Sequence, residues 1–455
     1  MVVVVPSKKS RILHRQPNAE LPMAFMGDGP YIIDDNGKRY IDASGGAAVS
    51  CLGHSNTRVR QAIKDQVDNI AFAHTSFFTS KPAEDLADFL VEHSPQGLDY
   101  AYLVSGGSEA VESALKLARQ YFIELGQDSR KYFIARRQSY HGNTLGALAV
   151  GGNLWRKQQF APILVDTEHV SPCYAYRDQK SDESELDYGL RIANELEQRI
   201  ESLGAKNVIA FVAEPIVGAT SGVLTPVPGY FKRIREICDQ HGILLILDEV
   251  MCGMGRTGSL FACEQEQVSA DILCVAKGLG AGYQAIGAML LSDKIYNTIT
   301  DGSGFFQHGH TYQAHATACA AALAVQQEIQ DNNLIDNVQN MGLKLQSALL
   351  SQFGNHPNIG DIRGRGLFWG IELVADRVTK KPLDPKLKVH SAIKTAAMNE
   401  GLICYPGGGT IDGKQGNHIL LAPPFIINEK HVTEIVDKLA RAIDTALVNC
   451  GLGND

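Results

Sequence analysis

The sequence predicts an α/β protein: a mostly parallel sheet of seven strands with helices on both faces, and a smaller α/β domain formed by both chain ends. Seven short runs in the middle of the chain are continuously apolar, and segments with apolar residues at helical spacing alternate with them. Continuous apolarity is typical of strands in a parallel sheet that is covered on both faces. The seven runs are residues 101–104, 132–135, 163–165, 208–213, 243–247, 272–275 and 286–291.

The N-terminal part of the chain contains a predicted hairpin. Residues 31–34 and 38–42 are rich in β-forming side chains, and Asp35, Asn36 and Gly37 separate them. An Asn-Gly pair between two such stretches is typical of a tight hairpin turn. Because the hairpin has no obvious place in the large sheet, we assign it to the smaller domain.

The pattern changes again after about residue 325. An apolar run covers residues 367–374, residues 388–399 have a helical pattern, and Asn428 is placed to cap a final amphipathic helix. The polar segment 171–187 is expected to be a surface loop, and residues 406–409 either a flexible turn or the rim of a pocket. The predicted division of the chain is an N-terminal segment belonging to the small domain, a large domain and a C-terminal small domain, at residues 1–60, 61–325 and 326–455.

Composition places the chain among ordinary globular enzymes. Its 455 residues carry 42 Lys and Arg against 50 Asp and Glu, a net charge of −8, and 44% are hydrophobic. This content is too apolar for a disordered chain, and the length exceeds what one core normally serves, so two lobes are expected. The acidic balance gives no electrostatic reason to expect a nucleic-acid or membrane partner.

The cysteines indicate a reducing compartment. Nine are present, an odd number, and none forms a C-x-x-C pair. They are therefore expected to be free thiols. The valine run at residues 2–5 is too short for a signal peptide or a membrane span. Together these features predict a cytoplasmic protein.

Residues capable of chemistry directly follow four of the apolar runs. A glycine-rich turn at 105–108 follows the first, and Glu214, Asp248 and Lys277 follow three others. In open parallel sheets the ligand crevice lies outside the carboxyl ends of the strands. The sequence therefore predicts that an amine, carboxylates and a glycine-rich turn meet at one edge of the sheet.

Each of these features also has a purely structural interpretation. The turn leads into a predicted helix whose free N–H groups favour a phosphate, but an ordinary strand-to-helix turn has the same pattern. Asp248 needs a cation or a ligand, and a salt bridge to Arg256 would suffice. Lys277 is flanked by small residues that would make its amine nucleophilic, or it lies on the surface. Taken together, an amine, an acid and an anion site indicate pyridoxal phosphate held as a Schiff base.

The surrounding motifs resemble those of a known family. Residues 247–258 (LDEVMCGMGRTG), followed by Ala276-Lys277-Gly278-Leu279, are similar to the signature of the class-III (omega-type) aminotransferases. Residues that support the resemblance elsewhere are 105–110, 139–144, 213–215, 308–312, 363–366 and 422–425. The resemblance covers nearly the whole chain and implies the pyridoxal-phosphate-dependent transferase fold of type I.

The resemblance also implies roles for individual residues. Lys277 is expected to form the Schiff base, and Asp248 to pair with the pyridinium nitrogen, which makes the ring an electron sink while the lysine moves the proton. Thr311 is expected to reach the phosphate in the partner subunit's site, which implies a homodimer with shared active sites. The remaining cofactor contacts are expected from Val250 and Tyr140 on the ring faces, His141 beside the ring, Gly107 and Ser108 at the phosphate, and Glu214 nearby.

Met251 bears on the substrate. By resemblance, an apolar residue followed by Cys-Gly is typical of amine:pyruvate-type members, which predicts transfer from a primary amine or omega-amino acid to a 2-oxo acid, with pyruvate as the usual acceptor. Ala48 stands where many members have Trp, so a roomier pocket is expected. Many members of the family have an arginine that binds a carboxylate at a position that falls near Gly413 and Lys414 here. Lys414 would offer only a point charge in its place. Phe77 and Phe78 match aromatic positions of the family's substrate pocket. Alternatively, two adjacent aromatic residues pack in the core or at a dimer interface.

Other reactions and other classes of protein remain alternatives to a transaminase. An amino-acid epimerase, decarboxylase or phospho-lyase of the same family would use the same lysine and aspartate. A dinucleotide oxidoreductase is disfavoured because no G-x-G-x-x-G occurs, and a cofactor-free binding protein because Lys277 and Asp248 are intact. His308 and His310 lack a third ligand at usable spacing, so no metal is expected.

Overall fold

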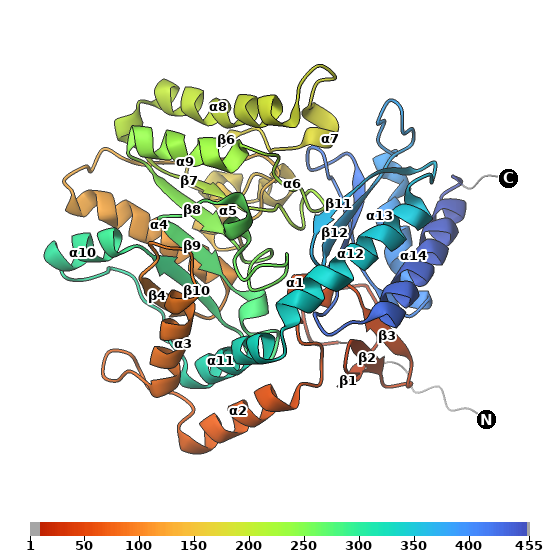
Figure 1. The fold of residues 1–455 in the computed structure, drawn as a ribbon, viewed down its shortest axis with the longest axis horizontal. Helices are drawn as coiled ribbons and strands as arrows, with labels where there is room; N and C mark the ends of the chain where they lie inside the picture. The colour runs from red at the N-terminus through yellow and green to blue at the C-terminus, as the bar shows by residue number, and fades with distance from the viewer. Residues whose placement is uncertain (1–9, 453–455) are drawn as a thin grey trace.

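The computed structural model describes residues 10–452, so the valine run at residues 2–5 lies outside the described residues. The chain forms two lobes, with the large sheet on the left of Figure 1 and a smaller lobe on the right. The smaller lobe combines the first strands of the chain with its last quarter, so segments from both chain ends lie side by side (Figure 1). Within residues 10–452, no helix combines the length and apolarity required to cross a bilayer.

The large lobe is built on the predicted seven-stranded sheet. All its neighbouring strands are parallel except β10, which runs antiparallel to both β4 and β9. In spatial order the strands are β4 (Tyr100–Val104), β10 (Gly287–Leu291), β9 (Ile272–Val275), β8 (Leu244–Asp248), β7 (Val208–Ala213), β5 (Tyr132–Arg136) and β6 (Thr167–Val170).

Consecutive residues of the central strands alternate between two buried faces. In β8, Leu245 and Leu247 join one apolar cluster, while Leu244 and Ile246 join another on the opposite side. This explains the continuous apolarity, because both sets of side chains need cover. Helices covering the first side are α3 (Lys81–Glu92), α8 (Glu185–Leu203), α9 (Tyr230–His241) and α11 (Ala316–Asp331), and those covering the second are α4 (Gly107–Glu124), α5 (Leu145–Val150) and α10 (Asp293–Asp301).

One predicted strand is wrong. Residues 163–165 do not form a strand: a 3₁₀ turn ends at Ile163, and Ile163 and Val165 are 62% and 63% exposed. The strand that pairs with β5 is instead β6, with the sequence Thr-Glu-His-Val. Because β6 is an edge strand, it needs no continuous apolar run and gave no such signal.

The smaller lobe contains the predicted hairpin and helices. The hairpin strands β2 and β3 are confirmed, and β3 pairs in parallel with β13 through Leu402 and Ile41, which joins the two chain ends. Its first sheet consists of β1 (Ala24–Asp28), β2 (Tyr31–Asp34), β3 (Arg39–Asp42) and β13 (Leu402–Ile403), and its second of β11 (Ile359–Arg365), β12 (Phe368–Leu373), β15 (Asn417–Leu421) and β14 (Tyr405–Gly408). Of the two alternatives for residues 406–409, the flexible turn is wrong because they lie mostly in β14, and the pocket rim is confirmed because all four residues line a cavity.

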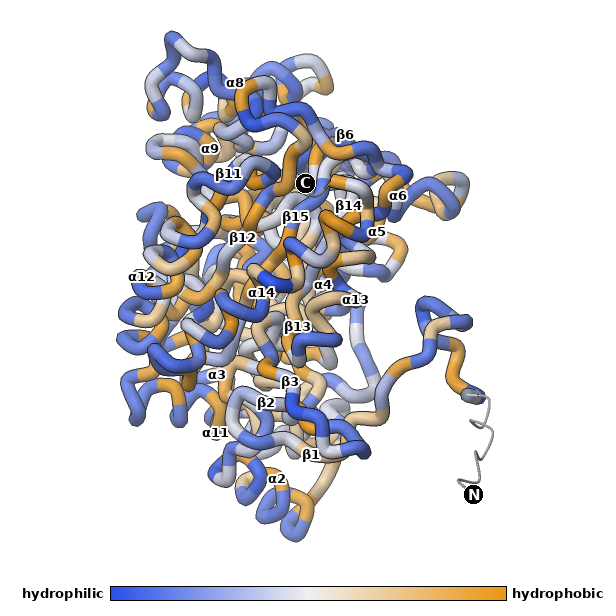
Figure 2. Tube along the Cα trace, turned by 90° about the vertical axis from the view of Figure 1, so that its right-hand side faces the viewer, coloured by the Kyte–Doolittle hydropathy of each residue, from blue (hydrophilic) through white to orange (hydrophobic). Residues whose placement is uncertain are grey.

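The helices of this lobe pack on its sheets around a common apolar core. Asn428 caps the last helix as predicted, accepting hydrogen bonds from the N–H groups of Lys430 (3.1 Å) and His431 (3.3 Å). Strands β12 and β15 are fully buried, although each combines hydrophobic with polar residues. The tube of Figure 2 shows both kinds of residue in this region. The helices are α12 (Leu334–Phe353), α13 (Val389–Asn399) and α14 (Glu429–Asn449), and α2 (Thr57–Asn69) adds its buried Val59 to the same core. The short helices outside this core are α1 (Gly45–Ala48), α6 (Leu154–Lys157) and α7 (Ala175–Asp178).

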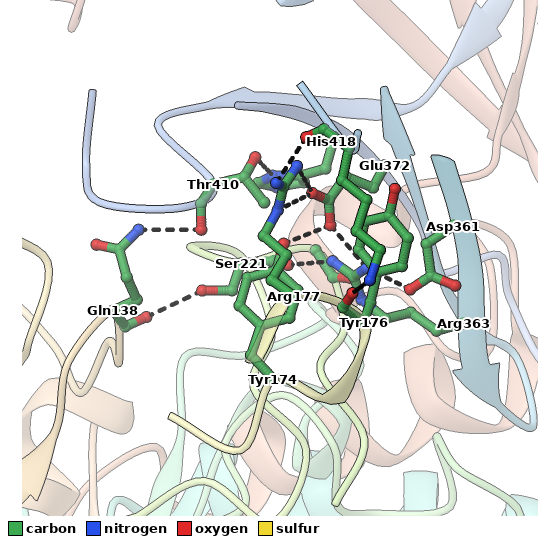
Figure 3. A network of polar contacts seen from close by, with 12 residues as sticks. Gln138, Tyr174, Tyr176, Arg177, Ser221, Asp361, Arg363, Glu372, Thr410 and His418 are labelled. Atoms are coloured by element: carbon green, nitrogen blue, oxygen red, sulfur yellow. Dashed lines mark hydrogen bonds and ion pairs between the residues drawn. The ribbon is translucent and has the colours of Figure 1, made fainter. Parts of the chain in front are cut away.

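A network of buried polar groups joins the two lobes (Figure 3). The carboxylate of Glu372 on β12 accepts hydrogen bonds from the Tyr174 hydroxyl, from Arg177 Nε (2.7 Å) and from Arg363 Nη1 (2.8 Å). Although burial acts to raise the pKa of Glu372, the two guanidinium groups hold it below its ordinary value. The expected surface loop at 171–187 is therefore wrong in part, because its polar residues pair with the small lobe and Tyr174 is buried.

Candidate active site

The carboxyl ends of the strands meet at a cavity of about 400 Å³. Asp248 is the last residue of β8, Glu214 follows β7, and Lys277 lies two residues beyond β9. Met251 lines this one cavity, and so do all the residues expected to contact the cofactor except Thr311: Gly107, Ser108, Tyr140, His141, Glu214, Asp248, Val250 and Lys277. The predicted convergence at one edge of the sheet is therefore what the chain adopts.

Lys277 supplies the amine. It begins a short 3₁₀ turn with a left-handed φ of 48°, and its side chain lines the cavity. Burial lowers the pKa of its amine from 10.5 to about 8, opposed by the negative charges of Asp248 and Glu214. A larger neutral fraction near physiological pH makes this amine a better nucleophile than a surface lysine.

Asp248 is held by two donors rather than by an arginine. Its Oδ2 lies 2.7 Å from Nδ1 of the buried His141, and its Oδ1 accepts a hydrogen bond from the Val250 N–H (3.0 Å). Arg256, the alternative partner in the sequence, instead lies over the Phe425 ring, 4.6 Å from its centroid. The aspartate is thus oriented by its own loop and by His141, as an acid that pairs with a ligand requires.

The glycine-rich turn brings a helix N-terminus to the cavity. A Cβ on Gly107, the first residue of α4, would lie 2.7 Å from Cγ1 of Val250, so only glycine allows this approach. The Ser108 hydroxyl accepts a hydrogen bond from the Asn143 N–H (3.1 Å), and Gly142 (φ 137°) provides the close contact this needs. The first N–H groups of a helix have no partner within it, which suits an anion such as a phosphate.

Two buried polar atoms of the cavity have no hydrogen-bond partner within residues 10–452. These are His141 Nε2 and Glu214 Oε2. Burial raises the pKa of Glu214 to about 7, with His141 and Arg136 acting against the rise. Unpaired buried polar atoms are costly, so they indicate that a polar ligand completes the site. Together with the amine, the acid and the anion site, they fit pyridoxal phosphate.

The structure places the other predicted residues elsewhere. Ala48 is buried in a core cluster with Met251, and its neighbour Val49 lines the cavity. Phe77 and Phe78 are 79% and 69% exposed, and they and the exposed Thr311 lie outside the Lys277 cavity of their own chain. Lys414 lines a different cavity.

Several lining residues were missed in the sequence. Gln284, Ala285 and Ile286 reach the cavity because β10 is antiparallel, so its amino end lies at the carboxyl ends of its neighbours. Strand direction leaves no local signal, so nothing in the sequence revealed them. Arg156 was also missed: its guanidinium lies over the Tyr140 ring, 4.6 Å from the centroid, a contact between segments that no short motif encodes.

Comparison with known proteins identifies the family. The model of aminotransferase class-III matches residues 16–443, and the chain belongs to this family. It is a pyridoxal-phosphate-dependent transaminase.

Similar proteins align with this chain over nearly the full length of both. An uncharacterized aminotransferase of Schizosaccharomyces pombe is 44% identical over 97% of this chain and 96% of its own. The uncharacterized aminotransferase YodT of Bacillus subtilis is 38% identical over 95% of this chain and 97% of its own. The crystal structure of an omega transaminase from Pseudomonas jessenii in complex with PMP matches with a TM-score of 0.89 and 34% identity over 95% and 94%.

Proposed function

We propose that this transaminase moves an amino group from a primary amine or an omega-amino acid to a 2-oxo acid, with pyruvate as the acceptor. The observation that carries the assignment of the donor is the composition of the Lys277 cavity. Val49, Met251 and Ile286 line it beside the polar groups, and no arginine of residues 10–452 does. A wall without a guanidinium suits an uncharged substituent next to the reacting amine.

Similar structures support the same substrate class. One is a thermostable omega transaminase variant engineered for asymmetric synthesis of enantiopure bulky amines, with a TM-score of 0.89 and 34% identity. Ala48, whose small buried side chain packs in one cluster with the cavity residue Met251, supports a roomy pocket in this chain.

The proposed roles follow from the positions of the side chains. Pyridoxal phosphate, when bound, supplies an aldehyde that condenses with amines and a ring that withdraws electrons from the adjacent carbon. Lys277 Nζ binds that aldehyde and afterwards accepts and returns the substrate proton. Asp248, oriented by His141, holds a proton at the ring nitrogen. The remaining roles are packing on the two ring faces by Val250 and Tyr140, phosphate binding by Gly107 and Ser108, and a polar contact by Glu214.

We propose that two copies of the chain share their active sites. Phe77, Phe78 and Thr311 are exposed and lie outside their own chain's Lys277 cavity. Large exposed aromatic side chains are typical of protein interfaces. In a homodimer, Thr311 would complete the partner's phosphate site, and the two phenylalanines would border its substrate pocket.

A cytoplasmic location is also proposed. All nine cysteines lie within the described residues, and none of them forms a disulfide. Eight are buried. Free thiols are typical of a reducing compartment.

Two measurements test the proposed reaction. Adding an amine donor alone to the cofactor-loaded enzyme should abolish the visible band of the bound cofactor and release one equivalent of carbonyl product. Adding pyruvate should then restore the band and yield alanine. Retention of the band with every donor in a panel would refute transamination, and a preference for 2-oxoglutarate would refute the assigned acceptor.

The second measurement tests Lys277. Lys277→Ala should abolish turnover and the visible band, because no other side chain replaces its amine. The matched control is Lys394→Ala, on the exposed side of α13, which should leave both unchanged. Activity retained by Lys277→Ala would contradict the assigned role.

A further inference from the structure

A second cavity, of about 860 Å³, lies between the two lobes. Three cationic side chains line it: Arg15 from the N-terminal segment, Arg156 from α6 of the large lobe, and Lys414 from the loop between β14 and β15 of the small lobe. No aspartate or glutamate of residues 10–452 is among its lining residues. We refer to this space as the cationic cavity.

The three cations are not neutralised by the protein. Within the described part of the chain, none of them takes part in an ion pair with a carboxylate within 4.0 Å. Asp412, the acid nearest to Lys414 in sequence, uses one carboxylate oxygen to accept the backbone N–H groups of Lys414 (2.8 Å) and Gln415 (2.7 Å). Like charges gathered without a counter-charge repel one another, and an anion relieves that repulsion.

One aromatic ring separates the cationic cavity from the catalytic one. Tyr140 lines the Lys277 cavity, and Arg156, which lies over the Tyr140 ring at 4.6 Å, lines the cationic cavity. Arg156 is also close enough to Lys277 to contribute to lowering the pKa of its amine, after the larger effects of burial and the two carboxylates. The positive charge of Arg156 therefore lies one aromatic ring away from a wall of the Lys277 cavity.

A hydrogen-bonded bridge holds the cations of the two lobes together. Gln138 donates from Nε2 to the carbonyl oxygens of Gly409 (2.7 Å) and Thr410 (3.1 Å) in the small-lobe loop (Figure 3). Its Oε1 accepts a hydrogen bond from Asn153 (3.1 Å), and Asn153 Oδ1 in turn caps α6 through the N–H of Arg156 (3.2 Å). The segments that carry Arg156 and Lys414 are thus both fixed to one buried side chain.

Close packing of the loop completes this arrangement. Gly413, with a left-handed φ of 86°, lies so near α6 that a Cβ there would be 3.3 Å from the backbone nitrogen of Trp155. A glycine directly before Lys414 therefore lets the loop pack against the helix that carries Arg156. The cationic cavity is a preformed feature of the lobe interface rather than a chance meeting of surface side chains.

We propose that the cationic cavity binds the carboxylate of an omega-amino acid whose amino group reacts at Lys277, with Arg156 as the principal donor. The proposal rests on the proposed function and narrows its substrate class. A guanidinium binds a carboxylate through two parallel hydrogen bonds, whereas Lys414 and Arg15 add charge around it. Because the carboxylate lies beyond Tyr140, several carbons must separate it from the amine.

The experiment compares donors that differ only in the carboxylate. γ-Aminobutyrate, δ-aminovalerate and ε-aminocaproate are each paired with the straight-chain monoamine of the same length, with pyruvate as the acceptor. The ratio of interest is the KM of the omega-amino acid divided by the KM of the monoamine of the same length. For the chain length at which the natural enzyme has the lowest ratio, Arg156→Gln should raise it by ~10-fold or more, the effect of losing a charge-assisted contact. Arg156→Lys should recover part of the loss. The control is Arg377→Gln, an exposed arginine outside the cationic cavity, which should leave the ratio unchanged.

The outcomes separate this proposal from the proposed function. An unchanged ratio in Arg156→Gln, or a rise confined to the KM of pyruvate, would overturn the assignment of the cationic cavity to the donor. Calorimetric binding of ε-aminocaproate to the cofactor-free protein gives a readout independent of turnover. Binding that Arg156→Gln weakens, in an enzyme that transfers no amino group, would sink the proposed function and leave the cavity's role standing. Turnover without any dependence on Arg156 would support the proposed function and overturn the role assigned to the cationic cavity.

Discussion

The pKa of Lys277 controls how fast the cofactor-free enzyme captures pyridoxal phosphate. Only the neutral amine attacks an aldehyde, and the amine has its pKa lowered from 10.5 to about 8 by burial. Roughly a tenth of the amines are then neutral at pH 7 and about nine tenths at pH 9. The capture rate should therefore rise by ~10-fold over this range and level off above it.

Replacing Asp248 sharpens this prediction. Its negative charge is the largest influence that raises the pKa of Lys277 against burial. Asp248→Asn should therefore lower that pKa further and move the inflection of the capture rate below pH 8. Capture at pH 7 becomes faster, even though turnover should fall by ~100-fold or more because the ring nitrogen loses its acid.

Stopped-flow absorbance after mixing the cofactor-free protein with pyridoxal phosphate measures the capture rate at each pH. Asp301→Asn, at the exposed end of α10, is the matched control and should keep the inflection near pH 8. An inflection near 10.5 in the natural protein would refute the effect of burial. An Asp248→Asn profile that coincides with the natural one would refute the coupling between the two side chains.

Three further predictions concern other parts of the molecule. Gly107→Ala should raise the Kd of the cofactor by ~10-fold in a fluorescence titration, since the new Cβ would lie 2.7 Å from Val250; unchanged affinity would contradict the close approach. Glu372→Gln, which removes the acid that pairs with the largely buried guanidinium groups of Arg177 and Arg363, should cost ~3 kcal/mol in denaturant unfolding. The exposed ion-pair control Glu429→Gln should cost under ~1 kcal/mol. Folding raises the pKa of Glu214 from 4.5 to about 7, so its contribution to the free energy of unfolding is complete below pH 4.5 and lost as the pH rises through 7. In the cofactor-free protein, Glu214→Gln should therefore make the loss of unfolding free energy over this pH range smaller by about 3 kcal/mol. A variant whose stability depends on pH in the same way as the natural protein would count against this.

Local and periodic features could be predicted from the sequence. Six of the seven apolar runs are strands of the large sheet, because strands buried on both faces require continuous apolarity. Asn428 caps the last helix because its short side chain accepts N–H groups two and three residues ahead. The meeting of Asp248, Glu214 and Lys277 followed from one rule, since each stands at or just beyond the carboxyl end of a parallel strand.

Features that depend on distant segments could not be predicted in this way. The edge strand β6 is polar because one side of it has no neighbour, and β10 reverses its direction with no local signal. The segment 171–187 looked solvated because its partner, Glu372, lies about two hundred residues further along the chain. Hydrogen bonds and ion pairs between distant segments have no spacing that a sequence pattern can show.

By itself, the sequence determined six of the seven strands of the large sheet and the chemical groups that stand at its edge, because both depend on neighbours along the chain. Only the tertiary structure decided that Arg156 and Lys414 face one cavity, since they come from different lobes and are brought together by Gln138 and by the close approach that Gly413 permits. The catalytic groups can therefore be predicted from local motifs, whereas the positive charge of the cationic cavity arises from the packing of the two lobes.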